Sequence, residues 1–156
     1  MATTIGTRAA STFPAMTGGA GRQLVAWGSQ AWGAEQAAGD IWVACKVPAG
    51  ATVTHGWLIA TDMDSNTDET IDIDVGYAAN GDVIADPDAF GNFGPTPGDV
   101  SVHQPVAGVY LPFHGVLVSG GPITFNKDTD IIVTFTDDAA TFASGRTTLI
   151  VHYVCP

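Results

Sequence analysis

The stretch that decides the fold is residues 61–77, which read Thr61-Asp62-Met63-Asp64-Ser65-Asn66-Thr67-Asp68-Glu69-Thr70-Ile71-Asp72-Ile73-Asp74-Val75-Gly76-Tyr77. The first half is polar and crowded with carboxylates, which is typical of a turn. The second half alternates Ile71, Ile73 and Val75 with Asp72 and Asp74, and this two-residue period predicts a half-buried β-strand. Because the stretch holds six of the chain's sixteen acidic residues, it also raises the question of a metal site.

Strand-like runs separated by turn residues recur on both sides of this stretch. We expect strands at residues 23–27, 40–47, 51–61, 70–77, 108–118, 123–125, 130–136 and 147–155. Asp86-Pro87-Asp88-Ala89-Phe90 has the cap, proline and early acid of a single helical turn, and residues 91–108 predict a loop. No segment predicts a long helix. The sequence therefore predicts an all-β protein, an antiparallel β-sandwich of jelly-roll type.

A chain of 156 residues is most simply one domain, which we place at residues 22–156. Residues 1–21 are small and polar, so we predict an extended N-terminal arm there. Its bulky side chains, Ile5, Phe13 and Met16, are candidates for contacts with neighbouring protein chains.

The last predicted strand is apolar on both sides. Leu149, Val151 and Tyr153 share one face, whereas Ile150 and Val154 lie on the other. A strand with two apolar faces requires a second covering layer. We therefore add Ile150 and Val154 to the interface candidates, to be covered by this chain or by another subunit.

Charge excludes several classes of function. The net charge is −11, and the five Lys and Arg residues are scattered along the sequence, so neither nucleic acid nor an anionic membrane surface is an expected partner. The N-terminal sequence has no charged leader before an apolar run, so no secretory signal is expected. Only 13% of residues are charged, against about a quarter in ordinary soluble domains, which suggests that partners cover part of the surface.

The acidic turn resembles half of a calcium loop. Asp62, Asp64, Asn66 and Asp68 occupy every second position, as in an EF-hand, but the sixth position holds Thr67 and the twelfth is not Glu. We therefore favour carboxylates that solvate a hairpin and protect the strand edge. A looser Ca²⁺ site at Asp62, Asp64 and Asp68 stays open, and no other metal or cofactor is expected.

No catalytic motif is found. Asp72 and Asp74 have a spacing that would suit the carboxylate pair of a glycoside hydrolase. Half-buried strands often show polar residues at this spacing, however. The histidines lack metal-ligand spacing, and Cys45 and Cys155 are expected to be buried thiols. The sequence has four tryptophans, Trp27, Trp32, Trp42 and Trp57. For these side chains we favour a place in the core, then a protein interface, and last a sugar-stacking platform. We predict no enzyme.

These motifs together resemble small virion structural proteins of tailed bacteriophages. The resemblance covers about residues 40–155. It rests on Lys46-Val47-Pro48-Ala49-Gly50-Ala51-Thr52-Val53, Asp62-x-Asp64-Ser65-Asn66, Ile71-Asp72-Ile73-Asp74-Val75-Gly76-Tyr77, Asp86-Pro87-Asp88-Ala89-Phe90, Asp130-Ile131-Ile132-Val133-Thr134 and Leu149-Ile150-Val151-His152-Tyr153-Val154.

The resemblance implies a head decoration, or cement, protein on the outer capsid surface of the virion, made in the host cytoplasm. Its implied partners are the major capsid protein and further copies of itself, with a trimer favoured. The net charge agrees with an outward position, because a lining that faces DNA would meet phosphate repulsion. Two alternatives stay open: another virion component, such as a head fibre base or tail protein, and a Ca²⁺-dependent carbohydrate-binding module for host attachment.

Overall fold

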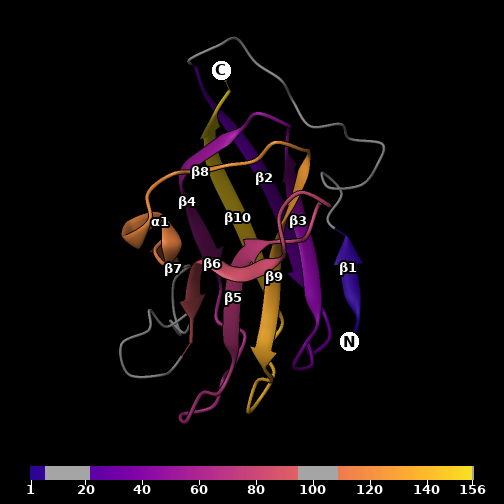
Figure 1. Ribbon diagram of the computed structural model, residues 1–156. Helices are drawn as coiled ribbons and strands as arrows, with labels where there is room; N and C mark the ends of the chain where they lie inside the picture. The colour runs from indigo at the N-terminus through magenta and orange to yellow at the C-terminus, as the bar shows by residue number, and fades with distance from the viewer. Residues whose placement is uncertain (6–21, 95–108, 156) are drawn as a thin grey trace.

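The computed structural model describes residues 1–5, 22–94 and 109–155, and within them two β-sheets pack face to face (Figure 1). The first sheet has the order β1-β3-β9-β5-β6. Its strands are β1 (Thr3–Ile5), β3 (Ile41–Val47), β9 (Thr129–Asp137), β5 (Asp72–Tyr77) and β6 (Asp86–Phe93). The second sheet has the order β2-β10-β4-β7, and β8 also pairs with β4. Its strands are β2 (Gln23–Trp32), β10 (Gly145–Val154), β4 (Thr52–Ala60), β7 (Val109–Pro112) and β8 (Ile123–Thr124). The described residues contain one helix, α1 (Val116–Ser119), and no helix among them is long and apolar enough to cross a membrane.

The expected all-β sandwich is confirmed, and most of its strand pairs are antiparallel. The exception is β1, which runs parallel to β3 with Thr3 opposite Ile41 and Ile5 opposite Val43. The carboxylate of Asp40 fixes this segment, since its Oδ1 accepts a hydrogen bond of 2.6 Å from the backbone N–H of Ala2. Backbone N–H donors from Ala2 and Ala37 lower the pKa of Asp40. The carboxylate therefore stays ionised while it accepts the hydrogen bond from Ala2.

Alternating apolar residues from both sheets form the core between them. On β10, Leu149 and Val151 are fully buried and Tyr153 is nearly so, as the sequence predicts. Near one end of the core, where β2 ends and β3 begins, the Trp32 ring lies edge-on to Trp42 at 6.0 Å and to Phe135 at 5.3 Å between centroids. Such edge-to-face pairs stabilise a core beyond the apolar area they bury.

Three local predictions are wrong. Residues 86–90 form the start of strand β6, not a helical turn, because Ala89 and Phe90 are fully buried and the strand pairs with β5. One helical turn has little stability of its own, and Pro87 is tolerated because β6 is an edge strand. The predicted strand 108–118 ends at Pro112 and is followed by α1. The acidic stretch is not a hairpin, since β4 and β5 belong to different sheets.

A buried hydrogen bond in the core makes the first testable prediction. The indole N–H of Trp32 donates to Thr147 Oγ1 at 3.0 Å, and Thr147 is fully buried. Thr147→Val keeps the shape but leaves the indole N–H without its partner, so we expect a loss of about 2 kcal/mol in the free energy of unfolding. Urea denaturation measures it. Thr148→Val, one residue along at a partly buried site, is the control and should cost under about 1 kcal/mol.

Candidate functional site

The acidic loop between β4 and β5 is built around one buried carboxylate. Asp64 is fully buried. Its Oδ1 accepts hydrogen bonds from the backbone N–H groups of Asn66 and Thr141, at 3.2 and 2.9 Å. Its Oδ2 accepts from those of Thr70 and Ala140, at 2.9 and 2.8 Å. One carboxylate therefore joins two segments of the loop to the chain that leads into β10.

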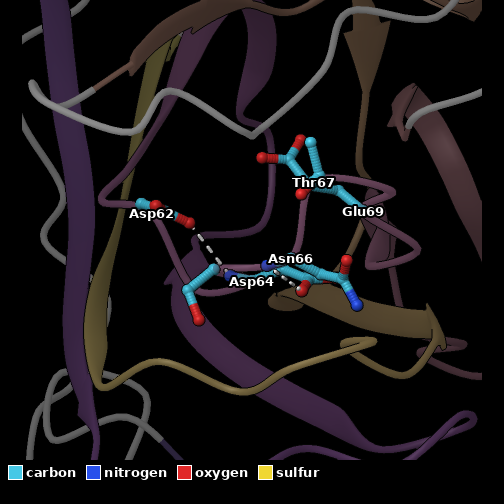
Figure 2. A pocket seen from close by; sticks show the side chains of 6 residues that line it. Asp62, Asp64, Asn66, Thr67 and Glu69 are labelled. Carbon is cyan, nitrogen blue, oxygen red and sulfur yellow. Dashed lines mark hydrogen bonds between the residues drawn. The ribbon is translucent and has the colours of Figure 1, made fainter.

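The spacing that resembled a calcium loop has a different physical basis. Asp62 Oδ1 accepts from the N–H of Asp64 at 3.0 Å, and Asn66 Oδ1 accepts from the N–H of Asp68 at 3.1 Å. Together with the bond from Asn66 to Asp64, these form three successive turns, each closed by a side chain onto the backbone two residues on. Figure 2 shows Asp62 and Asn66 on either side of Asp64, at a hollow of about 350 Å³.

The electrostatics of Asp64 suit a structural role. Burial by itself raises the pKa of this carboxyl, but the four backbone N–H donors outweigh it and lower the pKa to about 2. The expectation of purely solvated carboxylates is thus wrong for Asp64. Within residues 1–5, 22–94 and 109–155, no group of three or more His, Cys, Asp or Glu side chains is placed to hold a metal ion. The oxygens of Asp64 already face four N–H donors.

The outward side of the β2-β10-β4-β7 sheet presents a different chemistry. Cross-strand partners Trp27 and Ile150, and Ile150 and Trp57, form one apolar row. Val25, Trp27 and Tyr110 are 43%, 42% and 68% exposed. We call this the apolar face, and its members are Val25, Trp27, Trp57, Ile59, Tyr110 and Ile150.

Two stacked histidines lie within the apolar face. The rings of His55 and His152 are 4.4 Å apart and nearly parallel, and the Trp57 ring meets both edge-on. His55 Nε2 lies 3.2 Å from Gln23 Nε2, whereas Nδ1 of His152 is buried without a hydrogen-bond partner. Burial first, and His55 second, lower the pKa of His152, so this ring stays neutral near pH 7 and adds to the uncharged surface.

The outward side of the other sheet is acidic and polar. Its strands β5, β6 and β9 contribute two Asp residues each, whereas none of the five strands of the β2-β10-β4-β7 sheet contains Asp or Glu. Asp74 accepts a hydrogen bond of 2.8 Å from Asn92 Nδ2, and Asp130 forms an ion pair of 2.7 Å with Lys46. The two outer sides of the sandwich are therefore unlike: one is apolar and has no Asp or Glu on its strands, whereas the other carries Asp residues beside the cross-strand pair Val43 and Ile132.

The other residues singled out from sequence fall into place around these faces. Trp32 and Trp42 are core residues, 5% and 0% exposed, whereas Trp27 and Trp57 belong to the apolar face, which the sequence did not distinguish. Cys45 and Cys155 are both buried, as expected.

The predicted interface residues are only partly described. Ile150 and Val154 both lie on the outward side of β10 and are partly buried. The backbone of Ile5 lies in β1. Phe13 and Met16 lie outside the described residues.

These observations define the protein as a β-sandwich with two unlike outer faces. No protein-family model matches the sequence, and no curated protein matches it. Solved structures do match. A chain of the cyanophage Pam1 capsid asymmetric unit is 25% identical with a TM-score of 0.70, over 92% of this chain and 91% of that one.

Two further capsids contain chains of the same fold. A chain of the capsid of Ralstonia phage GP4 matches over 99% of both chains, with a TM-score of 0.77 and 20% identity. A chain of the acidic stable capsid of Helicobacter pylori bacteriophage KHP30 matches over 86% of this chain and 88% of that one, with a TM-score of 0.55 and 13% identity. The resemblance to phage virion structural proteins is therefore confirmed, and the chain has the fold of a phage capsid structural component.

Proposed function

We propose that this chain is a head decoration protein that binds the outer surface of a phage capsid and stabilises the shell. The observation that carries the proposal is the likeness to a chain of the cyanophage Pam1 capsid over nine-tenths of both chains. The proposed partners are the major capsid protein and further copies of this chain, with a trimer as the expected assembly.

We also infer that the sandwich is a jelly roll. The strand orders β2-β10-β4-β7 and β3-β9-β5-β6 place consecutive strands alternately in the two sheets from β2 to β5. They also bring β10 next to β2, and β9 next to β3. This is the arrangement of two Greek keys wrapped into a double sheet.

The proposed mechanism is mechanical. Each subunit contributes a modest contact across the shell, and many such contacts add through multivalency, which opposes the outward pressure of packaged DNA. The acidic sheet supports an outward orientation, because packaged phosphate would repel its exposed carboxylates, Asp88 and Asp137.

Binding to shells tests the proposal directly. The purified protein is mixed with shells of the phage assembled without it, and co-sedimentation and imaging follow. We expect saturable binding on the outer surface of the head and a higher melting temperature for decorated shells. A protein that leaves these shells bare, or that imaging places in the tail, would contradict the proposal.

The N-terminal residues give a further prediction. Deleting residues 2–21 removes β1, which pairs with β3 over only three positions, so we expect the sandwich to stay folded. Shell binding should fall by about tenfold or more, because a contact worth about 1.4 kcal/mol or more is lost. Circular dichroism checks the fold, and co-sedimentation checks the binding. Equal shell occupancy by the two proteins would rule out a role for the arm.

A further inference from the structure

We propose that the apolar face is the surface that docks on the capsid shell, and that its partner is an apolar protein surface edged with carboxylates. This inference rests on the proposed function and adds to it the docking side of the sandwich and the chemistry of the partner.

The composition of the apolar face is that of an interface centre. Trp27, Trp57 and Tyr110 supply large rigid side chains, and aromatic residues of this kind dominate the energy of protein contacts. Trp27 and Ile150 are directly paired across β2 and β10, and Ile150 and Trp57 across β10 and β4. The apolar row is therefore held on three adjacent strands of a rigid sheet, which lowers the entropy lost on binding.

The charges around the apolar face identify the partner. The strands that form it contain no carboxylate, although the chain as a whole has a net charge of −11. The exposed side chain of Arg146 lies at one end, where its guanidinium donates to Ser29 Oγ at 3.2 Å. Arg22 is exposed next to the start of β2 at the other end. A neutral centre with cations at its ends is complementary to an apolar surface edged with Asp or Glu.

A second copy of the chain fits this surface poorly. Its own apolar face would bring arginines to arginines. Docking through the apolar face on a different protein leaves the acidic sheet in solvent, which is the orientation proposed above.

Shell binding by surface variants of the full-length protein tests the inference. Trp27→Ser and Tyr110→Ser each remove an aromatic side chain that is already partly exposed, so both variants should fold. We expect at least one of them to weaken binding to undecorated shells by about 30-fold, the effect of losing an interface hot spot. The control is Ile84→Ser, which removes an 89% exposed apolar side chain outside both sheets and should change binding by less than about twofold.

Arg146→Glu should weaken binding and reduce its dependence on salt.

Each outcome is decisive. If the wild-type protein leaves the shells bare, the proposed function fails. If the wild type binds and both aromatic variants bind equally well, the proposed function stands and the docking surface is wrong. If light scattering shows that Trp27→Ser turns an oligomer into a monomer, a second copy occupies the face and the inference is overturned. Tighter binding by Arg146→Glu would overturn the carboxylate-edged partner.

Discussion

Replacing Asp64 by alanine should lower the free energy of unfolding by about 4 kcal/mol, near the upper end of single-substitution effects. Four backbone N–H groups end on this fully buried carboxylate. Without it they lose a charged acceptor, and the segments at Thr70 and Thr141 lose their connection to each other. Urea denaturation at pH 7 measures the change.

The same carboxylate makes stability depend on acid. Its folded-state pKa of about 2 lies below the ordinary value of 3.8, so the ionised form stabilises the fold. This contribution is complete above about pH 4 and is lost as the pH falls through 2. The difference between the two values corresponds to about 2.5 kcal/mol. Unfolding free energies measured between pH 5 and pH 2 should therefore fall more steeply for the wild type than for Asp64→Asn, which has no carboxyl to protonate there.

A neighbouring carboxylate supplies the control. Asp68 lies in the same loop but is exposed, so Asp68→Asn should change stability by less than about 0.5 kcal/mol. The structural role of Asp64 would be refuted if the two Asn variants were equally stable, or if Asp64→Asn followed the wild-type dependence on pH.

The sequence predicted the strands where apolar alternation coincides with burial. Residues 40–47 and 51–61 were expected as strands, and the structure has Ile41–Val47 and Thr52–Ala60. Residues 86–90 were assigned wrongly because local cap and proline signals describe only the isolated segment, whereas pairing with β5 and burial of Phe90 decide its conformation. Local propensity is weaker than such tertiary contacts.

The acidic loop and the apolar face could be predicted from the sequence to different extents. The spacing of Asp62, Asp64 and Asn66 is visible, but two donors to Asp64 lie 76 and 77 residues away, and no local pattern reports them. The apolar face was detected at Ile150 because β10 is apolar on both sides. It was not extended to Trp27, because in 23–27 both alternating sets are largely apolar and the sequence does not say which set points inward.

Replacing Gly28 by alanine should destabilise the protein by about 3 kcal/mol, although alanine normally stabilises a strand relative to glycine. A Cβ at this position would lie 2.0 Å from the carbonyl oxygen of Ala44 and 2.8 Å from its carbon. Gly28 is on β2 and Ala44 is on β3, so a strand of one sheet approaches a strand of the other here at backbone distance. Because backbone atoms cannot rotate away as a side chain can, the sheets themselves must separate to admit the methyl group.

Gly33→Ala is the matched control for this substitution, since a Cβ at Gly33 meets no atom within 4 Å. It should leave stability unchanged or raise it by up to about 1 kcal/mol, whereas Gly28→Ala should lower the melting temperature by about 10 °C. Thermal unfolding followed by circular dichroism separates the two. Equal melting temperatures would mean that the sheets are not in contact at Gly28. The opposite signs expected for one chemical change, five residues apart, follow from the close approach of β2 and β3 and not from any intrinsic preference of the strand.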